Sequence, residues 1–390
     1  MKQRLTNLLK YNRTVYSFYY YVMNFALRVL SLFVRQDDSI ILFNSYAGRK
    51  YDDSPRAIYE AMIQDSRFKG KRIIWAFHEP EKYPELIAEK VKTDTLQYFV
   101  IALRAKVWVT NSSVERGLKF KKKGTLYFNT WHGTPIKIMG SDLKQDNQSF
   151  APKSESVDDV RMSQSEFETE VFSRSFHIPK NHFLEAGLPR NDELAHVTAG
   201  VKQKIRAELG IAEGKKVLLY CPTFREYEKD EKLGVVSKPP IDLKKWQQVL
   251  GDNYVLLFRA HYEVSKVLGI KENEFVLDMT SYPRLNDLMI AADILISDYS
   301  SVFFDYAITG KPMLHYCYDY DVYSQHRGMY FDIRDYIGGA ENEGALLECI
   351  VNINMSESEQ KTVVFRDKFV NRYGNATQAA LDCIAAHVRE

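Results

Sequence analysis

ADILISDYSSVFFDY, residues 292–306, is the stretch that decides the fold of this chain. Its apolar run at 294–296 predicts a short buried strand, and the spacing over 302–308 predicts a helix. The polar turn between them presents backbone N–H groups and hydroxyls at the positive end of that helix, where a phosphate binds readily. The alternative is that Ser300 or Ser301 only caps the helix, although the same atoms can do both.

The same alternation of strand and helix extends on both sides of this stretch. In the first half, strands are expected at 39–43, 72–77, 107–110, 125–129 and 183–186, and helices at 55–64, 96–105 and 165–174. In the second half, strands are expected at 217–220, 254–258, 275–277, 294–297 and 313–316, and helices at 244–250, 285–291 and 302–308. Such alternation forms βαβ units with parallel sheets. The sequence therefore predicts an α/β protein of two Rossmann-like domains that face a central cleft at the carboxyl ends of their strands.

The length of 390 residues exceeds one ordinary core, so more than one domain is expected. We expect a helical segment at 1–37, a first Rossmann-like domain at 38–200, a second at 201–365, and a C-terminal helix at 366–390 that crosses back to the first domain. The hydrophobic fraction of 45% is that of a folded globular protein, and the net charge of +2 disfavours nucleic acid as the main partner. The four scattered cysteines lack metal-binding spacing, which favours free thiols in a reducing cytoplasm.

Residues 1–36 are basic and rich in aromatic side chains. Their basic residues, with no acidic residue among them, are Lys2, Arg4, Lys10, Arg13, Arg28 and Arg35. No small-residue cleavage site follows the apolar run at 16–34, which argues against a signal peptide, and Asn24 with Arg28 argues against a spanning helix. The segment predicts a helix that lies in the plane of an anionic membrane surface. A helix simply docked on the protein is the alternative.

Polar side chains gather where the predicted strands end. His132 follows the strand at 125–129, and Gly133 and Pro135 suit a tight turn into a helix, so that the histidine projects into the cleft. A histidine with a near-neutral pKa is a natural general base for a hydroxyl group. The alternative is a structural histidine beside Trp131.

Two further strand ends carry side chains that suit phosphate. Arg259 and His261 alternate with apolar residues after one strand, so they point the same way. Thr223 and Arg225 place a hydroxyl and a guanidinium after another strand. Each signal alone is weak, and their coincidence at strand ends indicates a phosphate-binding site.

Asp319 and Asp321 are spaced like a pair that holds Mg²⁺ or Mn²⁺ beside a diphosphate. No further acidic neighbours complete such a cage, and Arg327 follows closely. We therefore expect a hydrogen-bonding or loop-shaping role for these residues. We expect no metal bound by the protein and no permanently bound cofactor; Mg²⁺ is left open, but not as a protein-bound site.

Several motifs, in one order along the chain, resemble a known family. They are WHGTPIK at 131–137, GLPRND at 187–192, PTFR at 222–225, RAH at 259–261, SDYSSV at 297–302 and DYDVY at 319–323, followed by Arg327 and Gly328. Together they are similar to the CDP-glycerol glycerophosphotransferases of bacterial teichoic acid synthesis, over about residues 39–336. The resemblance implies a GT-B-like fold, a CDP-alditol donor, and a lipid-linked acceptor reached from the cytoplasmic face of the bacterial membrane by a peripheral enzyme.

The resemblance also implies roles for individual residues. The catalytic pair is His132 and His261. The expected donor and phosphate contacts are Thr223, Arg225, Arg259, Ser297, Asp298, Ser300 and Ser301. The expected acceptor and cleft residues are Trp131, Gly133, Thr134, Lys137, Arg190, Asn191 and Asp192. In the implied mechanism an acceptor hydroxyl, deprotonated by His132, attacks the β-phosphorus of CDP-glycerol and CMP leaves.

The resemblance leaves alternatives open. The long polymerases of this family have a large extra N-terminal region that this sequence lacks, so a single-addition primase, a short polymerase and a capsule-type transferase all remain. CDP-ribitol is the alternative donor. A nucleotide-sugar glycosyltransferase shares the fold, but the motifs favour phosphotransfer. A non-catalytic membrane-docked scaffold is disfavoured because both histidines and Arg259 are present.

Overall fold

The computed structural model describes residues 12–143, 155–223, 225, 239–260 and 270–389. These residues divide into two compact units. The first comprises the described residues of Met1–His132, Gly140–Asp192 and Asn375–Glu390, and the second those of Gly133–Met139 and Glu193–Gly374. The division thus falls at Asp192 and Glu193, before the boundary predicted at 200 and 201, and the segment after His132 goes with the second unit.

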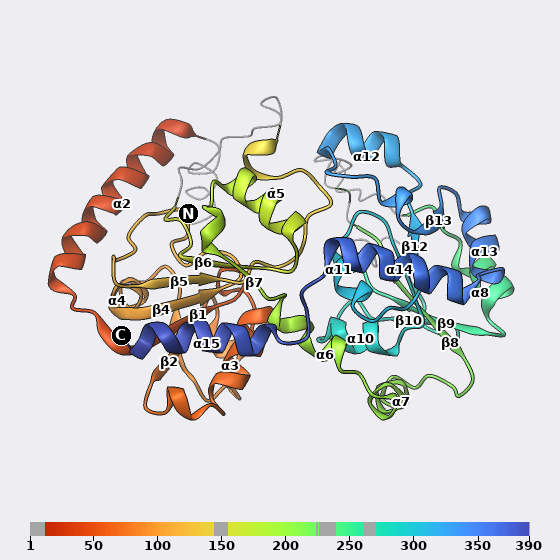
Figure 1. Ribbon diagram of the computed structural model, residues 1–390, viewed down its shortest axis with the longest axis horizontal. Helices are drawn as coiled ribbons and strands as arrows, with labels where there is room; N and C mark the ends of the chain where they lie inside the picture. The colour runs from red at the N-terminus through yellow and green to blue at the C-terminus, as the bar shows by residue number, and fades with distance from the viewer. Residues whose placement is uncertain (1–11, 144–154, 224, 226–238, 261–269, 390) are drawn as a thin grey trace. The chain divides into compact units, whose positions relative to one another are not determined.

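The first unit is built on a parallel sheet (Figure 1). Among the described residues this sheet has seven strands in the order β3-β2-β1-β4-β5-β6-β7. Their bounds are β1 Asp37–Asn44, β2 Arg72–Phe77, β3 Glu89–Lys92, β4 Ala105–Thr110, β5 Leu126–Asn129, β6 Val160–Ser163 and β7 Phe183–Glu185. The strand order runs outward in opposite directions from β1 and β4, so the carboxyl ends of these two strands form a topological switch point, where α/β proteins bind their ligands.

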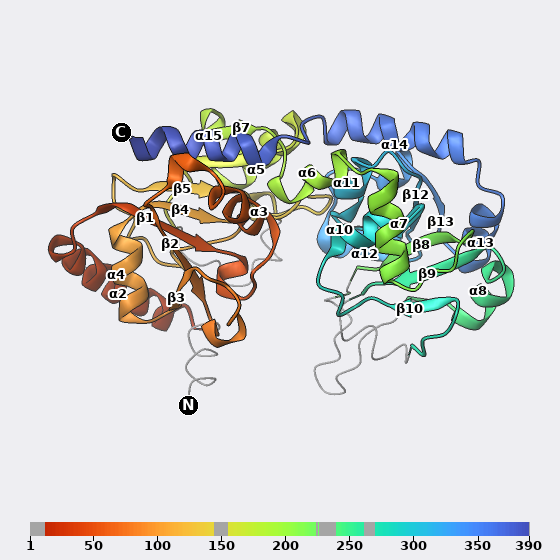
Figure 2. The same ribbon diagram turned by 90° about the horizontal axis from the view of Figure 1, so that it is seen from below.

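Helices cover both faces of this sheet. They are α2 Arg13–Phe33, α3 Asp53–Met62, α4 Leu96–Arg104, α5 Glu166–Phe176 and α15 Ala376–Arg389. Side chains alternate along β1, so Ile41 and Phe43 join a core with α3 and α15, whereas Ile40 and Leu42 join one with α2 and α4. Figure 2 shows α15 on one side of the sheet and α2 with α4 on the other. Both faces are buried, which explains the continuous apolar runs of these strands.

The second unit repeats the plan. Its sheet has six strands among the described residues, all parallel, in the order β10-β9-β8-β11-β12-β13. Their bounds are β8 Lys216–Cys221, β9 Tyr254–Phe258, β10 Val276–Asp278, β11 Ile294–Ser297, β12 Met313–Tyr316 and β13 Gly338–Ala340. The switch point here lies between β8 and β11, and β11 is the strand predicted from the opening stretch of sequence.

The helices of the second unit again lie on two faces. They are α7 Ala199–Glu208, α8 Leu243–Leu250, α10 Leu285–Ala291, α11 Val302–Ala307, α12 Tyr320–Arg327, α13 Glu343–Val351 and α14 Met355–Phe369. Helices α8 and α13 share a core with Leu218 and Ile294, while α10 packs on α7 and α11 on α14. The short helix α6 Asp192–Ala195 lies where the chain passes from the first unit to the second. The 3₁₀ turns are η1 Tyr46–Gly48, η2 Ser66–Phe68, η3 Pro80–Lys82, η4 Gly140–Asp142, η6 Lys180–His182, η7 Pro189–Asn191 and η9 Ile333–Asp335.

The structure confirms the predicted α/β class and the predicted strands and helices, several with the predicted bounds. Three short strands, β3, β6 and β13, were not predicted, and β13 is the sequence Gly-Gly-Ala, which has no strand propensity. The C-terminal helix predicted at 366–390 begins later than expected, because α14 ends at Phe369 and α15, which belongs to the first unit, begins at Ala376 after a break. Gly374 has a φ of 91° in this break, a left-handed conformation that ends regular helix.

Helix α2 docks on the first unit through one face. Leu27 is buried there, the Tyr16 hydroxyl donates to the carbonyl oxygen of Gly117 at 3.1 Å, and the N–H of Lys119 donates to Asn24 at 2.7 Å. The opposite face is exposed and apolar, and its side chains are Phe18, Tyr21, Val22, Phe25, Val29, Leu32 and Phe33. Within the described chain, no helix has both the length and the apolar character needed to cross a bilayer.

Candidate functional site

Polar residues of the first unit meet at the switch point of its sheet. Tyr46 comes shortly after β1, Asn111 follows β4 and His132 comes shortly after β5. Asn111 joins the other two, because its side-chain oxygen accepts the N–H of Tyr46 at 2.7 Å and its carbonyl oxygen lies 2.7 Å from Nδ1 of His132. The structure therefore places the predicted histidine in a cluster at the ligand-binding edge of a parallel sheet.

The contact with Asn111 fixes the tautomer of the His132 imidazole. A carbonyl oxygen accepts hydrogen bonds and cannot donate one, so Nδ1 carries a proton and, in the neutral ring, Nε2 keeps its free lone pair. Burial lowers the pKa of His132 below its usual value, and the smaller opposing effects of Asn111 and Asp53 do not reverse this. The neutral ring with Nε2 as acceptor is the form that a general base needs near pH 7.

The backbone around His132 differs from the prediction. No helix forms over 132–139, so the helix expected after this turn is wrong. Trp131 has a φ of 53° and Gly133 a φ of 146°, and both values interrupt helical geometry. The Trp131 ring stacks on His132 with centroids 4.3 Å apart and contacts Phe176 of α5 at 5.0 Å. Aromatic packing, rather than the expected helix, therefore holds His132 in position.

Arg190, in η7, contacts the backbone of His132. Its Nη1 donates to the carbonyl oxygen of His132 at 2.9 Å and pairs with Oδ2 of Asp53 at 2.7 Å. Asn191 beside it is buried. Arg190, one of the predicted GLPRND residues, thus contacts the histidine directly.

The other predicted acceptor residues contribute to the fold. Asp192 accepts the first two N–H groups of α15 at 2.9 and 2.7 Å, so it caps that helix. Gly133, Thr134 and Lys137 belong to the second unit, where Thr134 is buried and Lys137 forms an antiparallel bridge with Met329. These contacts separate the residues of WHGTPIK between the two units, with the division directly after His132.

The second unit gathers predicted donor residues at the carboxyl ends of β8, β11 and β12, with Arg225 at the centre. Its Nη1 donates to Asp298 at 2.9 Å, and its Nε and Nη2 donate to Asp319 at 2.7 and 2.9 Å. The side chains of Arg225 and Asp298 are each 1% exposed. The guanidinium also lies within 5.1 Å of the ring centres of Tyr299, Tyr318 and Tyr323. The N–H groups of the guanidinium thus bind protein carboxylates. This arrangement is better suited to holding the loops in place than to binding a phosphate directly.

Asp298 also organises the loop after β8. Its two carboxylate oxygens accept the N–H of Thr223 at 2.9 and 3.2 Å, and Ser297 Oγ donates to the carbonyl oxygen of Cys221 at 2.6 Å. The Oγ1 atom of Thr223 is buried and has no hydrogen-bond partner in the described part of the chain. Ser297 and Asp298 therefore connect two loops, whereas the Thr223 hydroxyl forms no hydrogen bond with the described residues.

The serine turn predicted to hold a phosphate leads into α11. Ser300 Oγ accepts the N–H of Val302 at 3.3 Å, while the Ser301 side chain makes no capping hydrogen bond. Both serines are half-buried. The long bond of Ser300 is a weak cap, and both alternatives set by the sequence, a cap and an anion site, are compatible with this turn.

Arg259 follows β9 and is half-buried. Its Nη1 donates to the carbonyl oxygens of Met279 and Tyr282 at 3.0 and 2.6 Å, which fixes the direction of the side chain. His261, the second predicted catalytic residue, lies outside the described residues. Of the predicted catalytic pair, the structure therefore describes His132.

The two aspartates of the DYD sequence have different surroundings among the described residues. Asp319 is engaged by Arg225 and accepts the Tyr299 hydroxyl at 3.0 Å. Asp321 is exposed in the first turn of α12, and Arg327 lies in its last turn. Over the described ranges, no group of three or more His, Cys, Asp and Glu side chains is arranged to hold a metal ion. Asp319 thus forms hydrogen bonds that hold this loop.

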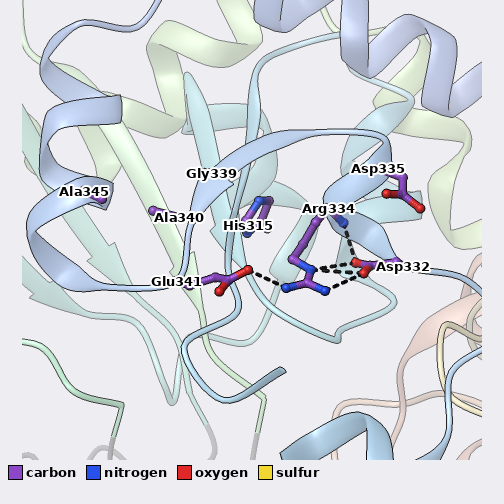
Figure 3. Close-up of a pocket in the computed structure, with 8 residues that line it drawn as sticks. All are labelled: His315, Asp332, Arg334, Asp335, Gly339, Ala340, Glu341 and Ala345. Carbon is purple, nitrogen blue, oxygen red and sulfur yellow. Dashed lines mark hydrogen bonds and ion pairs between the residues drawn. The ribbon is translucent and has the colours of Figure 1, made fainter. Parts of the chain in front are cut away.

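A pocket of about 550 Å³ opens beside β12 and β13 (Figure 3). It is lined by His315, Asp332, Arg334, Asp335, Gly339, Ala340, Glu341 and Ala345. Figure 3 shows Arg334 between Asp332 and Glu341, and its Nη2 lies 2.7 Å from Asp332 Oδ2. Burial, and then the charge of Arg334, lowers the pKa of His315 to about 4. The guanidinium is engaged by carboxylates, and none of the predicted site residues lines this pocket, so we do not assign the donor phosphates to it.

Tyr46, Asp53 and Asn111 were not among the site residues predicted from the sequence. Tyr46 ends the polar run Asn44-Ser45-Tyr46 at the end of β1, and Asn111 begins a polar run directly after β4. Polar residues at strand ends are the signal that identified His132, so the same reasoning could have found both. Asp53 had no such signal, because it opens a helix.

Comparisons with known proteins agree with these features. The sequence model of the family described as CDP-Glycerol:Poly(glycerophosphate) glycerophosphotransferase matches residues 26–385. The chain is 32% identical to a teichoic acid glycerol-phosphate transferase of Staphylococcus aureus, over 87% of this chain and 91% of that protein. It is 30% identical to a teichoic acid poly(glycerol phosphate) polymerase of Bacillus spizizenii, over 95% of each chain.

The fold is similar to that of a solved structure, the wall teichoic acid polymerase TagF. The TM-score is 0.81 at 29% sequence identity, over 97% of this chain and 98% of that chain. A further TagF structure, of an H444N variant soaked with CDPG, matches with a TM-score of 0.78. The likeness to TagF and the parallel sheets of both units make this fold GT-B-like, as the sequence predicted. The motifs, the site residues and the match over residues 26–385 together show that the chain is a transferase that belongs to the CDP-glycerol:poly(glycerophosphate) glycerophosphotransferase family.

Proposed function

We propose that this protein transfers glycerol phosphate from CDP-glycerol to a hydroxyl of a lipid-linked acceptor in teichoic acid synthesis, with release of CMP. The observation that carries the proposal is the contact of His132 Nδ1 with the carbonyl oxygen of Asn111, which leaves Nε2 as a base at the switch point. Family membership supports the substrate class, because the relatives are named for glycerol phosphate and a TagF structure was soaked with CDPG.

The proposed step is a direct phosphoryl transfer. The acceptor oxygen forms a bond to the β-phosphorus, the bond from that phosphorus to the bridging oxygen breaks, and CMP leaves with the bonding electrons. Nε2 of His132 takes the proton of the acceptor hydroxyl. Enzymes that transfer phosphoryl groups work mainly by positioning the reactants and by stabilising charge on the phosphates. We assign the acceptor to the first unit and the donor to the second.

We assign the donor phosphates to Arg259, Thr223, Ser300 and Ser301. Arg259 supplies a cation whose direction is fixed by two carbonyl oxygens, and the buried Thr223 hydroxyl has no partner among the described residues. Arg225 and the carboxylates that it bridges hold the loops that carry Thr223, Ser300 and Ser301. The family resemblance implies His261, which lies outside the described residues, as the second catalytic residue.

We further propose that α2 binds the cytoplasmic face of the membrane as a peripheral anchor. Two observations support this assignment: the apolar face of α2 is exposed, with Phe18 at 71%, Phe25 at 70% and Phe33 at 82%, and Arg28 is exposed on the same helix. Aromatic side chains on one face with a cation beside them suit the interface of an anionic bilayer. Such an anchor would bring the enzyme to its lipid-linked acceptor.

The test of the proposed reaction is CMP release by the purified full chain. CDP-glycerol and CDP-ribitol are supplied separately, each with and without a lipid-linked acceptor analogue. We expect acceptor-dependent CMP from CDP-glycerol. CMP release with CDP-ribitol but not with CDP-glycerol would show that CDP-ribitol is the donor. If folded protein released no CMP from either donor, the proposed reaction would be wrong.

A further inference from the structure

The backbone and side chain of His132 belong to a closed circuit of hydrogen bonds. Nδ1 of His132 contacts the carbonyl oxygen of Asn111, whose side chain accepts the N–H of Tyr46. The Tyr46 hydroxyl donates to Oδ2 of Asp53 at 2.5 Å, and the same oxygen accepts Nη1 of Arg190 at 2.7 Å. Nη1 of Arg190 returns to the carbonyl oxygen of His132 at 2.9 Å. The circuit thus connects the segments that follow β1, β4 and β5 with α3 and η7 around one imidazole.

We propose that Asp53 is a positioning residue for His132, acting through Arg190 on its backbone and through Tyr46 on its ring. The proposal rests on the proposed function of His132 as the general base. It extends that function to residues in α3 and η1 that no sequence motif identified. The chemical class of substrate is unchanged, and the new claim concerns how the base is held.

The surroundings of Asp53 exclude a direct catalytic role. Its side chain is 3% exposed in the pair with Arg190. One oxygen accepts both the Tyr46 hydroxyl and Arg190, and the other accepts the N–H of Ser54 at 2.6 Å. Burial alone would raise the pKa of Asp53, but Arg190 and the hydrogen bonds of Tyr46 and Ser54 outweigh burial and lower it. Asp53 is therefore a buried carboxylate with both oxygens engaged, suited to orient its neighbours rather than to take a proton.

The backbone of the circuit is strained at several residues. Tyr46, Ala47, Asp53 and Trp131 have φ values of 48°, 54°, 65° and 53°, which is the left-handed region that non-glycine residues avoid. Residues persist in this region only where the surrounding structure over-determines them, and such residues cluster at active sites. Tyr46 and Asp53 belong to the circuit around His132, Ala47 follows Tyr46 in the chain, and Trp131 precedes His132. The strained backbone, in addition to the hydrogen bonds, therefore supports a role of the circuit in holding the imidazole.

The charge of Asp53 also acts on His132. Among the described residues, Asp53, Arg190 and Arg161 are the charged groups with the largest influence on the imidazole, and the neutral Tyr46 ring lies 5.8 Å from it. Asp53 raises the pKa of His132, whereas both arginines lower it. Asp53→Asn keeps the shape of the side chain and removes its charge, so the arginines are left uncompensated. The pKa of His132 should then fall further, together with its strength as a base.

The decisive experiment compares Asp53→Asn and Tyr46→Phe with the wild type. For Asp53→Asn we expect kcat for CMP release to fall about 100-fold through displacement of the base, with the KM for CDP-glycerol little changed. The acid limb of the pH profile should move to lower pH. Tyr46→Phe keeps the ring and every charge, so we expect a smaller loss of kcat and no movement of the acid limb.

A second readout does not depend on turnover. The pKa of His132 is measured by NMR on histidine-labelled protein, with the His132 signal identified by its loss in His132→Asn. A lower pKa in Asp53→Asn supports the positioning role even if CDP-glycerol is not the donor, so the two proposals can fail separately. An unchanged His132 pKa together with an unchanged kcat would overturn the positioning role.

The matched control is Asp293→Asn. Asp293, like Asp53, is a carboxylate paired with a cation: it contacts Arg206 at 2.6 Å and Lys202 at 2.7 Å, but it is less deeply buried and belongs to the second unit. We expect this variant to lose thermal stability and to keep the wild-type pH profile and His132 pKa. If Asp53→Asn behaves in the same way as this control, Asp53 has a structural role only and the proposal is wrong.

Discussion

Arg225 and Asp298 form an ion pair at 2.9 Å in which each side chain is 1% exposed, so the second unit encloses a full pair of charges beside its switch point. Asp319 completes the arrangement by contacting the same guanidinium at 2.7 Å. Burial disfavours the charged form of Arg225, but the two aspartates outweigh burial and raise its pKa. The loops after β8, β11 and β12 are thus held by one cation.

This pair predicts a large effect of Arg225→Met on stability. The substitution leaves Asp298 charged and unpaired in buried surroundings, and breaking such a pair costs about 3–5 kcal/mol. Denaturation in urea measures the free energy of unfolding. The control is Arg56→Met, which breaks the more exposed pair of Arg56 with Glu60 and should cost under about 1 kcal/mol. Equal losses in the two variants would show that the buried pair contributes no more than an ordinary surface pair.

His132→Asn should lower kcat for CMP release about 10²–10⁴-fold, because it removes the general base. Binding of CDP-glycerol, measured by calorimetry, should change little, since we assign the donor to the second unit. The control is His182→Asn, because Nδ1 of His182 makes the same 2.7 Å contact with a carbonyl oxygen, that of Asp158. His182→Asn should leave kcat near the wild-type value. A loss of donor affinity as large as the loss of kcat would contradict the role of His132.

The pH dependence of kcat/KM should show an acid limb with its midpoint below pH 6.5, the ordinary pKa of histidine. Burial favours the neutral imidazole, so the base stays unprotonated to lower pH than a free histidine would. Activity should therefore be retained at neutral pH and lost as the pH falls through the lowered pKa of His132. The profile of kcat/KM reports the pKa of the free enzyme. A midpoint above pH 6.5 would mean that another group controls the limb.

Membrane binding should depend on the exposed face of α2. Phe25→Asp with Leu32→Asp places charges where Phe25 is 70% and Leu32 is 78% exposed, so the fold should be preserved. We expect at least about a tenfold loss of co-sedimentation with phosphatidylglycerol vesicles, the cost of withdrawing one large apolar side chain from the lipid. Vesicles of phosphatidylcholine should bind the wild type more weakly. Ile87→Asp, at a residue that is 98% exposed outside α2, is the control and should bind like the wild type.

The sequence predicted those parts of the fold that follow from local pattern. The apolar runs of β2, β9, β11 and β12 have the predicted bounds, because each lies between polar turns; β9, β11 and β12 are buried throughout, and β2 is buried over its last four residues. The sequence could not predict β13, whose residues Gly338–Ala340 gain strand geometry only from pairing with β12. The break between α14 and α15 was also missed, because it depends on capping by Asp192, which is distant in sequence.

In the candidate site, too, the sequence predicted local features but not those that depend on tertiary contacts. His132 was identified because it follows a strand and has a distinctive chemistry. The roles of Arg225 and Asp192 could not be deduced, since a guanidinium that binds phosphate and one that bridges two buried aspartates look alike in sequence. The circuit through Asp53 joins residues from distant parts of the chain, and only tertiary structure brings them together.

Helix α15 has a consequence for how the protein is made. Ala376, Ala380, Leu381 and Ile384 complete one core of the first unit, yet the ribosome adds them after all of the second unit. The emerging first unit therefore keeps the side of this core beside α3, β4 and β5 uncovered until α15 has been made. A nascent chain in that state exposes apolar surface that chaperones recognise.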